Sequence, residues 1–335
     1  MWEIRNNTPF ESRGVVVIDK TGQRHWVVVV KATFAIDEKG NLEIADEQVP
    51  PTVAPEYRGE PGTSSLLYEQ DLIAAKPRTD VYLNGVAHAP GGRPRTEVEV
   101  ALKTPAGTKV VIVRGDRTWR GGVVGAPQPS EPRPFVEMPI TYERAYGGYD
   151  NKDPDARKHR LYEQNPVGTG FVTKPEHRLG MPMPNIEWPG KDFETAPAGF
   201  GAVCSYWQPR RAFQGTYDDA WMKTQKPLLP VDYDPHALQC APRDQQTNGH
   251  LRGGEAFAMT NMHPSRPVIS FSLPRRNFGL LTVVGSKQLP HQAEIHTIVI
   301  EPARPRVIVT WHSMLSCHRD IDDIDYTVVI EKRRI

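Results

Sequence analysis

The polar side chains best suited to recognise a ligand or a partner lie in the segment 137–150. Glu143 and Arg144 stand next to each other there, followed by Tyr146 and then by two glycines. Because paired glycines adopt backbone angles that other residues resist, the segment is predicted to end in a tight turn. Arginine donates hydrogen bonds through a planar fork that matches a carboxylate. We therefore expect an ordered polar network in this segment.

A second segment of the same character covers residues 244–255. Arg252 and Glu255 flank another pair of glycines and again supply a fork-shaped donor and a matching acceptor. Two interpretations stay open for the two segments together. In the first, they attach irregular backbone to the sheets and satisfy buried polar groups. In the second, they surround a groove that binds a partner.

Histidines and cysteines do not occur at the spacing of a metal site. His236 and Cys240 are four residues apart and Cys317-His318 follows His312, but the sequence has no C-x-x-C pair and no H-E-x-x-H motif. Structural zinc usually requires such short-spaced pairs. The acidic run 320–325 lacks the glycine turn and distal glutamate of an EF-hand loop, and its charges fit a soluble strand edge. No metal and no other cofactor is predicted.

Catalytic patterns are equally scarce. The sequence has no G-x-S-x-G elbow, and none of its cysteines has the surroundings of a known nucleophile. Glu137 with Glu143 and Asp232 with Asp234 resemble glycosidase pairs, yet a chain with 40 acidic residues always offers such pairs. The segment 168–170 has no lysine at phosphate-loop spacing, so we interpret it as a turn. The sequence therefore predicts a protein that is not an enzyme.

Three tryptophans offer one further kind of site. Trp188, Trp207 and Trp221 all lie in the proline-rich middle of the chain. Exposed indole rings form platforms on which sugars or peptides stack, whereas buried ones anchor loops. Both interpretations stay open, and anchoring is the commoner use.

Composition places the chain among globular proteins of nearly neutral charge. With 41 basic and 40 acidic residues, nothing favours binding to nucleic acid or to an anionic membrane. Apolar runs such as 27–30 are far shorter than a membrane span. The first residues lack the pattern of a secretory signal, and the widely spaced Cys204, Cys240 and Cys317 fit reduced thiols. We therefore expect a cytoplasmic protein.

Proline divides the chain into two β-rich ends and an irregular middle. Of 32 prolines, 17 fall between residues 126 and 242, which forbids long helices across that region. Short helical signals occur at 216–225 and 236–239. Runs of β-branched and aromatic residues bounded by turn residues predict strands at 14–19, 25–34, 79–87, 97–102, 109–114, 268–273, 294–301, 307–311 and 325–332.

These elements predict a mainly β fold, with sandwich-like sheets that carry a long irregular middle rich in proline and glycine and few short helices. We expect one domain over 1–335. A possible subdivision separates an N-terminal β region at 1–125, an irregular region at 126–265 and a C-terminal β region at 266–335.

A series of short motifs gives the chain a specific resemblance. It resembles the type VI secretion adaptor proteins, a family long catalogued as a domain of unknown function and now regarded as effector chaperones. The similarity covers most of the chain, and the motifs that carry it are NNTPF and VVVVKATFAID near the start, PITYERAYGG at 139–148, NPVGTGF at 165–171, PNIEWP at 184–189, PAGFG at 197–201, WQPR at 207–210, then APRDQQ and LRGGE.

The resemblance implies a partner rather than a substrate. Such a protein would bind a secreted toxin in the bacterial cytoplasm, stabilise it and load it onto a VgrG trimer or a PAAR-type spike tip. The family brings no catalytic residues. Its rivals are a carbohydrate-active hydrolase on a β-sandwich and a structural component of the secretion apparatus.

Cargo would bind by strand addition to a sheet edge or in a groove. We expect the proline-rich middle to cover or line that groove, since proline limits the entropy lost on binding. The candidate residues near this surface are a polar framework with two aromatic neighbours, namely Glu143, Arg144, Arg252 and Glu255 with Tyr146 and Trp207.

Overall fold

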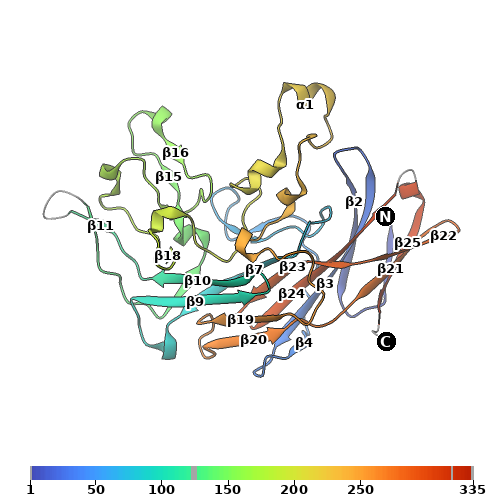
Figure 1. Cartoon of the computed structure of the whole chain (residues 1–335), viewed down its shortest axis with the longest axis horizontal. Coiled ribbons are helices and arrows are strands. Elements are labelled where there is room, and N and C mark those ends of the chain that lie inside the picture. The colour runs from blue at the N-terminus through green and yellow to red at the C-terminus, as the bar shows by residue number, and fades with distance from the viewer. Residues whose placement is uncertain (1, 122–126, 318–319, 333–335) are drawn as a thin grey trace.

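The computed structural model describes residues 2–121, 127–317 and 320–332 and confirms a mainly β fold (Figure 1). The subdivision boundary at 125–126 and His318 of the Cys317-His318 pair lie outside the described residues. In the part of the chain that is described, no helix is long and apolar enough to cross a membrane.

The longest strands belong to a six-stranded sheet that joins both ends of the chain. Its order is β2-β3-β24-β23-β7, and β4 pairs with β3. The central strand β3 is almost entirely buried, as expected for a strand covered on both faces. The strands are β2 (Glu11–Ile18), β3 (Arg24–Ile36), β4 (Leu42–Ile44), β7 (Asp80–Leu83), β23 (Glu294–Glu301) and β24 (Arg306–Ser316).

A four-stranded sheet packs on this one and completes a sandwich. Trp26 of the larger sheet donates from Nε1 to Thr327 Oγ1 at 2.9 Å, and the Phe278 ring meets Trp311 edge-on at 4.9 Å. The order is β1-β25-β21-β22, with β1 parallel to β25. Its strands are β1 (Glu3–Asn6), β21 (Phe278–Val284), β22 (Lys287–Gln292) and β25 (Ile324–Glu331).

A five-stranded sheet extends the molecule away from the sandwich (Figure 1). In its strand β9, exposed and buried residues alternate, as the polar and apolar pattern at 97–102 predicts. Strand β19 pairs with β9 and β20, so this sheet too combines both halves of the chain. The strands are β9 (Glu97–Thr104), β10 (Gly107–Arg114), β18 (Ile186–Glu187), β19 (Ala256–Thr260) and β20 (Val268–Ser272).

Short ladders and single turns account for the rest of the regular structure. Five two-stranded ladders pair β5 (Glu56–Tyr57) with β6 (Leu66–Tyr68), β8 (Gly85–His88) with β13 (Glu137–Ile140), β11 (Trp119–Arg120) with β12 (Gln128–Pro129), β14 (Tyr146–Gly147) with β17 (Thr169–Gly170), and β15 (Tyr149–Asp150) with β16 (Arg160–Leu161).

The described 3₁₀ helices are η1 (Pro90–Gly92), η2 (Tyr142–Arg144), η3 (Ala156–Lys158), η4 (Pro175–Arg178), η5 (Phe193–Thr195), η6 (Arg210–Gln214), η7 (Pro235–Leu238), η8 (Arg243–Gln245) and η9 (Asp320–Asp323). The signal at 236–239 thus corresponds to η7. The signal at 216–225 corresponds to the α-helix α1 (Asp219–Thr224), which begins after Asp218 because that side chain accepts from the Trp221 N–H at 2.8 Å.

The proline-rich middle forms two projections above the sheets (Figure 1). One carries β15 and β16, and the other carries α1. Residues of both projections are tied down by side chains. Gln225 Nε2, for example, donates to the Lys20 and Leu229 carbonyl oxygens at 2.7 and 3.0 Å. The irregular middle is therefore ordered by specific contacts rather than by long elements.

Each predicted strand corresponds to an observed one, and one of them is divided. The predicted strand at 79–87 is two strands, β7 and β8, which pair in different sheets. Of the strands in the three larger sheets, β1, β4, β18, β19, β21 and β22 were not predicted. Pro290 lies within β22, which is tolerated because β22 is an edge strand of its sheet.

Candidate functional site

Glu143 is held as a half-buried acceptor in the framework of the middle region. Its carboxylate accepts from the Ser65 backbone N–H at 2.6 Å and from Ser65 Oγ at 2.9 Å. Burial by itself raises the pKa of Glu143, but hydrogen bonds from Ser65 and Thr141 outweigh it and leave the pKa lowered. Glu143 therefore stays ionised and joins the β5–β6 turn to η2.

Arg144 makes its contacts on a different side of η2. Its guanidinium donates to Asn185 Oδ1 at 3.0 Å and lies 3.5 Å from the Asp116 carboxylate. Asn185 in turn donates to Asp116 and to the Arg114 carbonyl oxygen, both at 3.0 Å. The arginine thus links the middle region to the end of β10.

The glycine turn after Tyr146 is required by close backbone packing. Gly147 has a φ of 150°, and a Cβ placed on it would lie 2.2 Å from the Asn165 carbonyl oxygen. The Asn165 amide fills the centre of this turn by donating to the carbonyl oxygens of Tyr142 at 2.7 Å and Tyr146 at 3.0 Å. The motifs at 139–148 and 165–171 therefore form one interlocked unit.

Tyr146 and Trp207 lie in the interior. Tyr146 packs in an aromatic cluster with Tyr162 and Phe193 at 5.0 and 5.9 Å, and burial raises its pKa to about 12. Trp207 is 0% exposed and meets Tyr142 edge-on at 5.5 Å. Trp207 anchors the surrounding loops, because a ring without an exposed face cannot stack on a ligand.

The second polar segment, residues 244–255, is separate from Glu143 and Arg144 and is held by a hydrogen bond to its own backbone. Glu255 accepts from the Arg252 backbone N–H at 2.8 Å, so the two charged groups do not form the matched side-chain pair that the sequence suggested. Over the described ranges, no hydrogen bond or ion pair joins Arg252 or Glu255 to Glu143 or Arg144. The two segments serve separate parts of the molecule.

A buried ion pair missed from the sequence ties the middle region to the sandwich. Lys76 Nζ donates to Asp80 Oδ2 at 2.8 Å and to Thr297 Oγ1 at 2.9 Å. Asp80 also accepts from Gln239 Nε2 at 2.6 Å and from the Cys240 backbone N–H at 2.8 Å. Burial alone lowers the pKa of Lys76, but the Asp80 carboxylate outweighs it and leaves the pKa raised. Only the separation of four between Lys76 and Asp80 hinted at this pair.

Three histidine rings form a stack behind this ion pair. His250 lies 5.2 Å from His296, and His296 lies 4.2 Å from His312, with ring planes within 12° and 9° of parallel. His312 Nε2 lies 2.6 Å from the Ile73 carbonyl oxygen. Burial lowers the pKa of His312 to about 4 and that of His296 well below its usual range. In the chain as described, no group of three possible metal ligands converges.

The cysteines are buried as well, which the sequence left open. Burial raises the pKa of Cys204 to about 11 and that of Cys240 beyond it. Cys317 is also buried. Since a thiolate rather than a thiol is the nucleophile, burial makes Cys204 and Cys240 unreactive at neutral pH.

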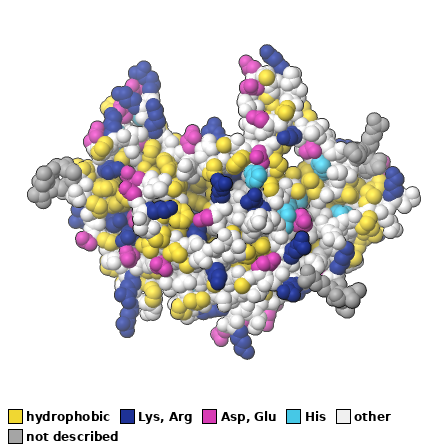
Figure 2. All heavy atoms as spheres, in the orientation of Figure 1, with side chains coloured by type: hydrophobic (Ala, Val, Ile, Leu, Met, Phe, Trp, Pro, Cys, Tyr) yellow, Lys and Arg dark blue, Asp and Glu magenta, His cyan; other side chains and the backbone are white. Residues whose placement is uncertain are grey.

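An apolar recess opens between the two projections. Its walls come from both sides: Tyr149 and Leu161 belong to the β15–β16 projection, while Tyr206 and Arg211 lie on the segment that leads to α1. Tyr149, Leu161 and Tyr206 are 51%, 49% and 39% exposed. The cavity measures about 650 Å³, and Figure 2 shows the surface hollowed between the projections. We call this feature the recess.

The comparisons with known proteins give one match. The profile of a bacterial family, described as an uncharacterized protein conserved in bacteria (DUF2169), matches residues 21–312. The chain belongs to this family. No curated protein and no solved structure matches it.

The DUF2169 match covers both projections, the recess and most of the sandwich. The family description refers to bacteria and makes no reference to type VI secretion. The link to secretion therefore rests on the motif resemblance.

Proposed function

We propose that this DUF2169 protein is a non-enzymatic cytoplasmic adaptor that binds a type VI secretion effector and helps load it onto the VgrG and PAAR spike. The recess between the projections is the observation that supports it. Tyr149, Leu161 and Tyr206 expose large apolar surface there. Exposed apolar patches of this kind are typical of protein-binding surfaces.

The rigidity of the recess walls fits a binding role. Beside Leu161, the Tyr149 hydroxyl lies 3.1 Å from His159 Nδ1, which holds the ring against that histidine. On the same projection, Asp150 accepts from the Thr173 N–H at 2.8 Å and from Thr173 Oγ1 at 2.6 Å. A surface that is already ordered loses little conformational entropy when a partner binds.

The candidate framework residues fit the same account. Glu143, Arg144 and Tyr146 fix the base of the β15–β16 projection through Ser65, Asn185 and the aromatic cluster. They act by positioning the recess walls. We expect their substitution to weaken cargo binding through loss of structure rather than through loss of a contact.

The geometry gives less support to the hydrolase alternative. Trp207 is fully buried, and the Trp188 ring lies 5.0 Å from Lys109 Nζ, while Trp221 packs against Tyr217 at 4.8 Å. The three indoles thus make separate local contacts instead of one platform. Asp232 accepts from the Thr216 N–H at 3.0 Å and Asp234 from the His236 N–H at 2.9 Å, so backbone donors hold both carboxylates.

A tagged pull-down from a native bacterial lysate tests the proposal. The wild-type protein should recover one toxin-like protein, with or without VgrG or PAAR, identified by mass spectrometry. Leu161→Asp should abolish that recovery, because a charge in the recess opposes apolar docking. Val268→Asp is the matched control, since Val268 is 58% exposed on β20 in the five-stranded sheet. Equal recovery with both variants would place the cargo elsewhere, and recovery of no cargo would contradict the adaptor proposal.

A further inference from the structure

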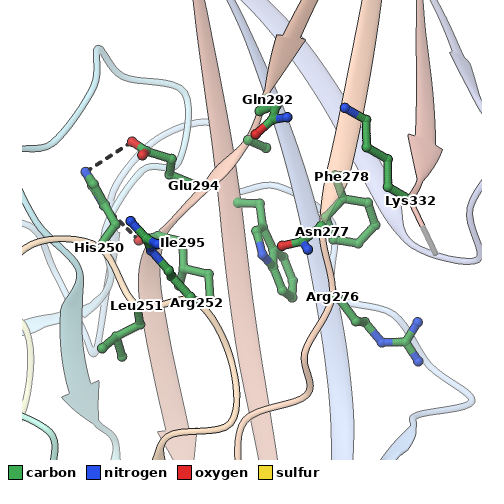
Figure 3. A pocket seen from close by; sticks show the side chains of 12 residues that line it. His250, Leu251, Arg252, Arg276, Asn277, Phe278, Gln292, Glu294, Ile295 and Lys332 are labelled. Carbon is green, nitrogen blue, oxygen red and sulfur yellow. Dashed lines mark hydrogen bonds and ion pairs between the residues drawn. The ribbon is translucent and has the colours of Figure 1, made fainter. Parts of the chain in front are cut away.

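A second groove lies where the chain crosses from the four-stranded sheet to the six-stranded sheet. Strand β22 ends there and β23 begins, and the Ala293 N–H donates to the Phe278 carbonyl oxygen at 3.2 Å. Leu251 forms a β-bridge to Ile295 on the opposite side. The groove measures about 560 Å³ and is shown in Figure 3. We call it the crossover groove.

The floor of the crossover groove is apolar and rigid. Phe278, Ile295 and Trp311 line it and are only 1 to 2% exposed. Phe278 packs edge-on against Trp311 at 4.9 Å, as part of the core of the sandwich. The floor therefore gives the groove a rigid base but exposes almost no surface of its own.

Four polar side chains surround this floor. Arg252, Asn277, Gln292 and Lys332 line the groove, and in the described part of the chain their side chains make no hydrogen bond or ion pair. Figure 3 shows them around the opening, with Arg252 on one side and Lys332 on the other. Two of them are cations, and together they supply the guanidinium, ammonium and amide donors that acceptor-rich groups require.

Within the described residues, neither Arg252 nor Lys332 forms an ion pair with the acidic residues beside the groove. Arg276 also lines the groove, but Glu331 accepts from it twice, at 2.7 and 2.9 Å. The acidic lining residue, Glu294, lies 3.4 Å from His250 Nε2. The charges of Arg252 and Lys332 therefore remain available to a ligand.

The LRGGE motif places Arg252 at this groove. The Arg252 N–H is fixed by Glu255, and a Cβ on Gly253 would lie 2.5 Å from the Pro274 carbonyl oxygen. Gly253 has a φ of 91°, so only glycine fits here without strain. The motif thus holds the loop tightly against the strand connection and presents the arginine side chain outward.

We propose that the crossover groove binds a carboxylate-bearing peptide segment. Arg252 and Lys332, on opposite sides of the groove, would each hold a carboxylate of the segment, since a guanidinium fork and an ammonium group form strong charge-assisted bonds to carboxylates. Asn277 and Gln292 both donate and accept, which suits the main chain of a peptide. Leu251 and Ala293, the partly buried apolar residues of the lining, would contact a neighbouring aliphatic or aromatic side chain. The assignment of this segment to the effector rests on the proposed function. The binding of an acidic peptide is independent of it.

Fluorescence polarisation on the purified full chain tests this inference. The probe is a fluorescein-labelled, amidated hexapeptide pool that alternates glutamate with apolar residues, and its control pool has glutamine at the same positions. The acidic pool should bind at least about tenfold more tightly, because one charged hydrogen bond contributes roughly 1.5–3 kcal/mol. Weak or equal binding of the two pools would overturn the proposal.

Variants identify the site. Arg252→Gln and Lys332→Gln should each weaken binding of the acidic pool about tenfold, with unchanged thermal unfolding. Arg275→Gln removes the same charge from an exposed neighbour that does not line the groove, and should change affinity by less than about twofold. Equal effects of Arg252→Gln and Arg275→Gln would show a general charge effect and refute the site.

Inorganic phosphate and free glutamate serve as competitors. One contrary outcome is that millimolar phosphate displaces the labelled pool as effectively as the unlabelled acidic pool does. That result would show a simple anion site and overturn the peptide assignment. These assays use no cargo protein, so their failure leaves the recess proposal intact. Loss of cargo recovery in the pull-down, in turn, leaves this inference intact.

Discussion

Removal of the Asp80 carboxylate should loosen the attachment of the middle region to the sandwich. Asp80 is 0% exposed and accepts three hydrogen bonds, from Lys76, Gln239 and the Cys240 backbone. The Asp80→Leu variant keeps the branching of the side chain but leaves the Lys76 ammonium buried without its counter-charge. Gln239 and the Cys240 N–H lose their acceptor as well.

The expected loss is large compared with total stability. Breaking a buried ion pair by removing one partner costs about 3–5 kcal/mol, and each unsatisfied buried donor adds about 1–3 kcal/mol. A domain is usually stable by only about 5–15 kcal/mol. We therefore expect Asp80→Leu to lose at least about 4 kcal/mol, and the double variant Lys76→Met/Asp80→Leu to regain part of that loss because no charge stays buried.

Urea unfolding followed by circular dichroism measures both effects, and pH gives an independent check. Without Asp80, burial should lower the pKa of Lys76 below its unfolded value. A lysine whose folded pKa is lowered binds fewer protons when folded, so the variant should gain stability relative to wild type as pH rises from 7 towards 10. Wild-type stability for Asp80→Leu, or a double variant that is less stable than the single one, would refute this reasoning.

Three further predictions concern the interior. Burial lowers the pKa of His291 and His312 to about 4, below the unfolded value. The stability that each neutral ring contributes above about pH 6.5 should therefore be lost towards pH 4, by about 3 kcal/mol per ring. Urea midpoints measured at both pH values check this, and an unfolding free energy that does not change between them would contradict it. Gly147→Ala should lower the free energy of unfolding by about 2 kcal/mol or more, whereas Gly190→Ala, whose new Cβ would meet open space, should lower it by about 1 kcal/mol. Equal losses for the two variants in calorimetry would argue against the packed turn at Gly147. Trp207→Ala should cost about 3–5 kcal/mol in the same assay, and a loss below about 1 kcal/mol would contradict its anchoring role.

Local patterns were sufficient to predict much of the fold. Strands β2, β3, β9 and β10 lie in β-branched runs bounded by turn residues, and the structure pairs β2 with β3 and β9 with β10 antiparallel. The parallel pairing of β1 with β25 was beyond reach, because it joins residues at opposite ends of the chain. Such contacts depend on tertiary packing rather than on local preference.

The candidate site was predicted less well, for a similar reason. The types of Glu143 and Arg252 indicated hydrogen bonding, but their partners are set by distant or backbone groups. Glu143 bonds Ser65, which lies 78 residues away, and Glu255 bonds the backbone of Arg252 instead of its guanidinium. The Lys76 and Cys240 neighbourhood spans 164 residues and had no sequence pattern at all.

Photo-crosslinking in the producing bacterium tests the central claim most directly. A benzoylphenylalanine placed at Leu161 samples the recess, and one placed at Val268 samples the five-stranded sheet, where the side chain is comparably exposed. The adaptor account predicts an adduct between position 161 and one toxin-like protein, with no such adduct at position 268. An adduct at 268 alone, or none at either position while the toxin is expressed, would contradict it.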